Sequence, residues 1–177
     1  MQVVVPEEFK SLYVHDEQNP IIKYPAEVLR TVAVPIKRYT RRYQTVGDNM
    51  VRVMNDARGY GLAAPQIGIS ERIIVLASDG KPTIMFNPVV VGSEGTQLGE
   101  EGCLSIPGLF GMVERAEKVE VEALDRKGRE STFRFEGLDA RVVLHEIDHL
   151  DGVLFIDKAD PTTFRWEMPK TAESDPE

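Results

Sequence analysis

Residues 138–150 read LDARVVLHEIDHL, and this segment carries the strongest structural signal in the chain. Its apolar residues recur on one side at helical spacing, which is typical of an amphipathic helix. They are Leu138, Val142 or Val143, and Ile147. We therefore predict that residues 138–150 form a helix with one buried face.

The same segment contains HEIDH at residues 145–149, an H-E-x-x-H pattern. Residues i and i+4 of a helix lie about 40° apart around the axis and about 6 Å apart along it, so His145 and His149 can bind one metal ion. Glu146 lies beside such an ion, where its carboxylate can take a proton from metal-bound water. The pattern predicts a hydrolytic metal site. The alternative is a solvated helix face that carries two histidines by chance.

A third metal ligand must come from elsewhere, because hydrolytic sites usually supply three protein ligands and keep one position for water. No histidine follows His149, and His15 lies in an irregular N-terminal segment. Downstream carboxylates are nominal candidates, namely Asp151, Asp157 and Asp160. We favour Cys103, the only cysteine, because nearby glycines and a proline are typical of a loop rather than of a buried packing position.

Outward from this helix, the middle of the chain is rich in short β-branched runs separated by turns. The predicted strands are 72–77, 83–86, 89–91, 118–124 and 131–135, with turns at 79–80 and 125–128. A second amphipathic helix is expected over 41–58 and a short one over 26–32. The pattern indicates an α+β fold, with mixed or antiparallel short strands around a central metal-binding helix that carries H-E-x-x-H.

Length and charge define the broad class of protein. The 177 residues, 42% of them hydrophobic, fit one domain spanning 1–177, with an irregular arm at 1–20 and a polar tail at 169–177. Lys and Arg number 21 against 29 Asp and Glu, and the net charge of −8 argues against binding to nucleic acid. The chain shows neither a membrane-spanning apolar run nor a signal-peptide pattern, so we expect no membrane association and a cytoplasmic location.

A segment of small residues follows the helix predicted at 41–58, where residues 59–66 read GYGLAAPQ. Gly59 and Gly61 permit close approach of the backbone to a ligand, and Gln66 can donate an amide N–H to an oxygen. Such a turn is by itself more often structural than functional. No glycine motif for nucleotide phosphates is present, so nucleotide binding is not supported.

Three segments, taken together and in this order, resemble the sequence motifs of peptide deformylases. They are GYGLAAPQ at 59–66, EGCLS at 101–105 and HEIDHL at 145–150, and the resemblance extends from about Pro25 to Asp157. It implies a hydrolase that removes the N-formyl group from the formylmethionine of nascent polypeptides and releases formate. N-formylmethionyl peptides are then the expected partners, with transient proximity to the ribosome.

The resemblance also implies roles for single residues. Cys103, His145 and His149 are expected to bind one ion per chain, Fe²⁺ with Zn²⁺, Ni²⁺ or Co²⁺ as substitutes. Glu146 is expected to act as general base and then general acid. The amide of Gln66 and the backbone N–H of Leu104 are expected to bind the formyl oxygen.

Further positions follow from the same resemblance. Tyr60, Gly61, Leu138 and Val142 are expected to bind the substrate, and Asp148 and Arg115 to support the metal ligands. Two positions depart from the family pattern, because Leu144 stands where glutamine is usual and Tyr60 where a small aliphatic residue is usual. The alternatives are a zincin-like metallopeptidase with an acidic third ligand, and an inactive metal-binding relative that does not need Glu146.

Overall fold

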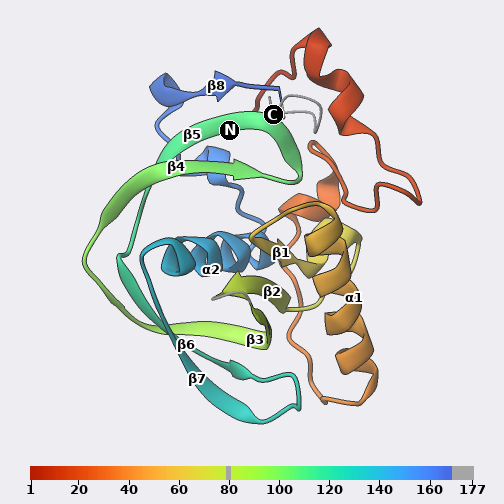
Figure 1. Cartoon of the computed structure of the whole chain (residues 1–177), viewed down its shortest axis with the longest axis vertical. Helices are drawn as coiled ribbons and strands as arrows, with labels where there is room; N and C mark the ends of the chain where they lie inside the picture. Colours follow the sequence, from red (N-terminus) through yellow and green to blue (C-terminus); the bar gives the residue numbers. More distant parts are fainter. Residues whose placement is uncertain (79–80, 169–177) are drawn as a thin grey trace, which may run out of the picture.

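The computed structural model describes residues 1–78 and 81–168, so the turn predicted at 79–80 and the tail predicted at 169–177 lie outside the described residues. Two antiparallel sheets lie on opposite sides of one helix, α2 (Gly137–Leu150) (Figure 1). A second helix, α1 (Arg42–Asp56), packs on β1 and β2 of the first sheet. Both helices start and end within two residues of the predicted bounds, and the combination of helices with antiparallel sheets agrees with the predicted class.

The first sheet has five strands in the order β1-β2-β3-β6-β7. Their bounds are β1 (Gly61–Ala63), β2 (Ile73–Ser78), β3 (Lys81–Glu94), β6 (Lys118–Leu124) and β7 (Glu130–Glu136). The predicted hairpin of β6 and β7 is confirmed, and Val121 pairs with Phe133 across it. Alternation of apolar and polar residues was sufficient to find this hairpin because only one of its faces is buried.

Strand β3 corrects the expectation of short strands, because it runs for 14 residues through both segments predicted at 83–86 and 89–91. The register with β6 shifts between Phe86 and Val89, and Asn87 adopts a positive φ of 52° there. The break in the apolar pattern therefore marks a bulge within one strand rather than the end of a strand.

The second sheet contains three strands in the order β4-β5-β8. They are β4 (Gln97–Cys103), β5 (Ile106–Arg115) and β8 (Arg165–Trp166). The expectation of a loop around Cys103 was wrong, since the cysteine ends β4 and only Leu104 and Ser105 connect it to β5. Glycine and glutamate have low strand propensity, but the long pairing with β5 overrides that propensity in β4.

The N-terminal arm is also more ordered than predicted. Within residues 1–20, η1 (Glu7–Tyr13) is a 3₁₀ helix, and its Phe9 ring is buried with its centroid 4.9 Å from that of Trp166. One buried aromatic residue fixes this segment, and a single residue produces no periodic pattern in the sequence. The other 3₁₀ segments are η2 (Glu27–Arg30), η3 (Ala64–Ile67), η4 (Phe155–Asp157) and η5 (Pro161–Thr163).

Helix α2 is buried on several sides because sheets lie both above and below it in the view of Figure 1. Its apolar residues pack on the first sheet, and α1 packs on that sheet through a separate apolar cluster. The helix ends before Gly152, whose φ is 70° and where a Cβ would lie 2.5 Å from the Arg30 carbonyl oxygen. Glycine at this position lets the chain turn away directly after the H-E-x-x-H segment. Of the helices in the described ranges, none has the length and apolar character needed to cross a membrane.

Candidate metal centre and catalytic site

Three potential metal ligands converge from two elements. Cys103 lies at the end of β4, and His145 and His149 lie one turn apart on α2. Their ligand atoms all lie within 4.8 Å of one another, and Cys103 Sγ is 3.3 Å from His149 Nε2. One thiolate and two imidazoles suit zinc, iron, nickel or cobalt.

The acidic candidates for a third ligand have other partners. Asp151 forms an ion pair with Arg72 at 2.6 Å, and Asp157 forms one with Arg30. Asp160 caps η5 by accepting a hydrogen bond from the backbone N–H of Thr162. The structure therefore brings Cys103, and none of these carboxylates, to the two histidines.

The buried carboxyl group of Glu146 supports the fit to a metal ion. Its Oε2 has no hydrogen-bond partner among the described residues. Burial raises the pKa of Glu146 to about 7, against the lowering effect of His145 and His149. An unpaired carboxyl group beside three converging ligands fits an ion that carries a water molecule, and a pKa near neutrality suits proton transfer in both directions.

The ionisation of Cys103 also favours metal binding. Burial alone would keep the thiol protonated, but the neighbouring His149 and His145 outweigh this and hold the pKa of Cys103 well below its usual value. Burial likewise opposes the charged form of His145, but contacts with Cys103 and Glu101 hold its pKa above the usual value. The thiolate is the form of cysteine that binds metals.

Glu101 holds the imidazole of His145 from behind. It accepts a hydrogen bond from His145 Nδ1 at 2.9 Å, two from Arg115 at 2.8 and 2.9 Å, and one from Arg141 at 2.8 Å. Burial opposes its charge, but these donors overcome burial and keep the pKa of Glu101 well below its usual range. A carboxylate in this position fixes the orientation of a metal-binding histidine.

Sequence reasoning missed Glu101 and Arg141, and it placed Asp148 and Arg115 in the supporting role. In the structure Arg115 bridges Glu101 and Asp148, so Asp148 lies one step further from the imidazole. The missing signal was available in the sequence, because residues two apart in a strand point to the same side. Had 97–103 been recognised as a strand, Glu101 would have been placed beside Cys103.

Gln66 lies in η3 with its amide aimed at the metal ligands. Its Oε1 accepts a hydrogen bond from the backbone N–H of Ala63 at 2.8 Å, which fixes the opposite end of the amide. Its Nε2 donates to Ser105 Oγ at 3.1 Å and lies 3.7 Å from Cys103 Sγ. Leu104 occupies the connection between β4 and β5, immediately after the cysteine. These two predicted oxygen-binding residues therefore flank the same sulfur.

A pocket of about 670 Å³ opens beside these groups, and the four residues predicted to bind substrate all line it. Tyr60 and Leu138 are 66% and 58% exposed, so they form its outer edge, whereas Val142 lies deeper. At Gly61 a Cβ would lie 2.5 Å from Glu146 Oε1, which leaves room there for glycine alone. Leu144 packs with the apolar cluster between α2 and the first sheet, so packing replaces any hydrogen bond from this position.

The sequence model of the polypeptide deformylase family matches residues 18–165 of this chain. The peptide deformylase of Desulfitobacterium hafniense is 49% identical over 145 residues, which cover 82% of this chain and 97% of the relative. The chain belongs to the peptide deformylase family. Membership in the deformylase family makes it an enzyme that removes the formyl group from N-formylmethionyl peptides.

Solved structures of other deformylases have the same fold. The peptide deformylase of Legionella pneumophila is 45% identical with a TM-score of 0.76, and the match covers 80% of this chain and 86% of that one. The peptide deformylase of Thermus thermophilus is 42% identical with a TM-score of 0.77, over 81% of this chain and 86% of that one. The two-sheet arrangement around α2 is therefore shared by deformylases of known structure.

Proposed function

We propose that Cys103, His145 and His149 bind one divalent ion and that Glu146 moves the proton during hydrolysis of the formamide. The observation that carries this proposal is the convergence of three ligand atoms within 4.8 Å, beside a buried carboxyl group with a pKa of about 7. When bound, the ion supplies a Lewis acid that lowers the pKa of water. Glu146 takes a proton as water adds to the formyl carbon, and it returns the proton to the amine nitrogen as the C–N bond breaks.

Gln66 and Leu104 stabilise the negative charge that develops on the formyl oxygen. The side-chain amide of Gln66 is fixed by hydrogen bonds at both its oxygen and its nitrogen, so it does not need to reorient during the reaction. The backbone N–H of Leu104, the residue directly after Cys103, supplies a second donor. One such fixed donor contributes about 3 to 4 kcal/mol to transition-state stabilisation in other hydrolases.

The methionine side chain of the substrate enters the pocket of about 670 Å³. Gly61 and Val142 line its inner part, and Tyr60 and Leu138 form its edge. Tyr60 is an exposed lining residue of this pocket, so the residues that follow methionine contact its ring.

The physiological ion we propose is Fe²⁺, with Zn²⁺, Ni²⁺ or Co²⁺ as substitutes, since a thiolate with two imidazoles accepts all four. A metal-binding thiolate requires reducing conditions because oxidised cysteine no longer binds the ion. This requirement supports a cytoplasmic location for the enzyme. In the cytoplasm, the enzyme would encounter its nascent peptide substrates near the ribosome. A net charge of −8 favours capture of the peptide itself over electrostatic attraction to RNA. We further propose that residues 1–177 act as one domain.

Metal content and formate release test this assignment in one experiment. Wild type and Cys103→Ser are prepared without oxygen, loaded with Fe²⁺ or Ni²⁺ and given a formyl-methionyl peptide. We expect about one ion per chain and formate from the wild type, and loss of both in Cys103→Ser. The matched control is Asp151→Asn, which alters one of the carboxylates considered as an acidic third ligand and should leave both values unchanged. A Cys103→Ser protein that keeps its metal and releases formate would refute the ligand set.

A further inference from the structure

A short N-terminal segment braces the two parts of the chain that surround the cysteine sulfur. This bracing segment, residues 22–24, makes one backbone hydrogen bond to each part. The N–H of Ile22 donates to the carbonyl of Gln66 at 2.7 Å, and the N–H of Tyr24 donates to the carbonyl of Ser105 at 2.9 Å. The segment therefore ties η3 to the connection between β4 and β5, although all three are distant in sequence.

Lys23, in the middle of the bracing segment, turns its ammonium group toward the site. Its Nζ donates to the carbonyl oxygen of Leu104 at 2.8 Å, and the side chain lines the same pocket as Cys103. No carboxylate in the described ranges forms an ion pair with this ammonium, so its hydrogen-bond partner there is a neutral peptide group. A partly buried cation with a neutral partner is costly unless a nearby negative charge compensates it.

The negative charge lies at the other end of the same peptide unit. The carbonyl of Leu104 and the N–H of Ser105 belong to one planar peptide group, in which C=O and N–H point in opposite directions. The Ser105 N–H donates to Cys103 Sγ at 3.4 Å. The peptide dipole thus lies between the Lys23 ammonium at its oxygen end and the thiolate at its N–H end, and both charges polarise it in the same sense.

We propose that Lys23 is a positioning residue that polarises the Leu104–Ser105 peptide and so strengthens the N–H hydrogen bond to the Cys103 thiolate. A stronger hydrogen bond withdraws electron density from the sulfur, and hydrogen bonds to sulfur are a known means of tuning thiolate-bound metals. Lys23 therefore sets how strongly Cys103 donates to the ion. This inference rests on the proposed role of Cys103 as a metal ligand.

The sulfur-to-metal charge-transfer absorption of the cobalt-loaded protein tests the inference directly. In Lys23→Met the sulfur becomes more electron-rich, so the band is expected to move to longer wavelength than in the wild type. Lys23→Arg keeps the positive charge and should return the band toward its original position. The matched control is Tyr24→Phe, which removes a hydroxyl bonded to the N–H of Val3 but keeps the backbone bond to Ser105, and it should leave the band unmoved.

The outcomes separate this inference from the function on which it rests. A wild-type protein that binds cobalt without any sulfur-to-cobalt band overturns the ligand set itself. If the wild type shows the band and Lys23→Met shows it at the same wavelength, the role of Lys23 alone is overturned. The same follows if the band of Lys23→Arg shifts as far as that of Lys23→Met. Should Lys23→Met fail to fold, Lys23→Gln supplies a neutral donor. A shift to longer wavelength then supports the inference, and an unmoved band refutes it.

Discussion

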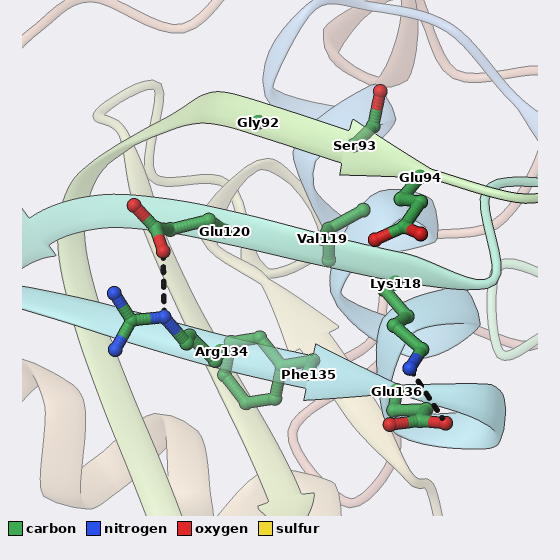
Figure 2. A pocket seen from close by; sticks show the side chains of 9 residues that line it. All are labelled: Gly92, Ser93, Glu94, Lys118, Val119, Glu120, Arg134, Phe135 and Glu136. Carbon is green, nitrogen blue, oxygen red and sulfur yellow. Dashed lines mark hydrogen bonds and ion pairs between the residues drawn. The ribbon is translucent and has the colours of Figure 1, made fainter.

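The structure contains two hollows of similar size that are lined by different residues, and their charged groups differ in burial and pairing. The first is the pocket beside Glu146, of about 670 Å³. The second, of about 520 Å³, lies over β3, β6 and β7, and Figure 2 shows the side chains around it. In the second hollow the charges occur as separate surface pairs, Arg134 with Glu120 at 2.6 Å and Lys118 with Glu136 at 3.4 Å.

The charges beside the first hollow are buried and shared. Glu101 accepts hydrogen bonds from His145, Arg115 and Arg141. Its side chain is only 4% exposed, compared with 37% for Glu120. Exposed ion pairs satisfy each other, are screened by water and contribute little. Buried convergent groups keep shifted pKa values and unpaired atoms, as Glu146 does. Burial and partnering of charges, more than the size of a hollow, distinguish the site.

Removal of the unpaired carboxyl group of Glu146 is expected to have the largest effect. Glu146→Ala is expected to retain the metal ion while its turnover falls by about 10²- to 10⁴-fold or more, because no group then transfers the proton. Formate release and metal content measured on the same preparation check this. Normal turnover in the variant would refute the mechanism and would agree with a metal-binding relative that does not need Glu146.

Loss of the shared carboxylate should affect the fold as well as the site. Glu101→Gln leaves the buried guanidinium group of Arg141 without its counter-charge and leaves Arg115 with Asp148 alone. We expect the free energy of unfolding to drop by about 3 to 5 kcal/mol. Metal affinity should fall about 10- to 100-fold because His145 loses its support. Denaturant unfolding and metal titration measure the two effects, and a variant as stable as the wild type would contradict the buried-network account.

The pH dependence of stability isolates the cost of burying Glu146. Its pKa rises from a usual 4.5 to about 7 in the folded, metal-free protein. Below the lower value both states hold the proton. Between these two pKa values the unfolded state has released the proton and the folded state still holds it. The free energy of unfolding of the wild type therefore decreases as pH rises, and the loss reaches about 3 kcal/mol above the higher pKa. Glu146→Gln lacks this loss, so its stability relative to the wild type should increase over this pH range. The test is the free energy of unfolding of both metal-free proteins as a function of pH, and parallel curves would contradict the prediction.

The smallest effect is expected in the second hollow. Glu120→Gln removes one partner of an exposed pair, so stability should change by less than about 1 kcal/mol, and turnover should not change. It is also the matched control for Glu101→Gln, since the same chemical change is made in an exposed and in a buried carboxylate. An equally large loss at both positions would remove the distinction between the two hollows.

Regular periodicity made α1 and the β6–β7 hairpin predictable, because each buries one face and exposes another. It also located α2, although this helix is buried on several sides rather than on the one predicted face. Strand β4 could not be found this way, since its glycines and glutamates owe their extended conformation to pairing with β5. The H-E-x-x-H spacing placed His145, Glu146 and His149 on one helix from local geometry alone. Glu101 was missed together with β4, on which it lies two residues from Cys103. Arg141 and Lys23 contact the site through tertiary contacts between distant segments, which leave no local pattern.

The position of α2 in the chain has a consequence for how the enzyme matures. Cys103 precedes His149 by 46 positions, and every strand of the five-stranded sheet is synthesised before the helix that brings the histidines. Closing the chain between such distant residues costs conformational entropy, which slows the formation of these contacts. During synthesis the cysteine therefore emerges before its partners and is open to oxidants until α2 docks.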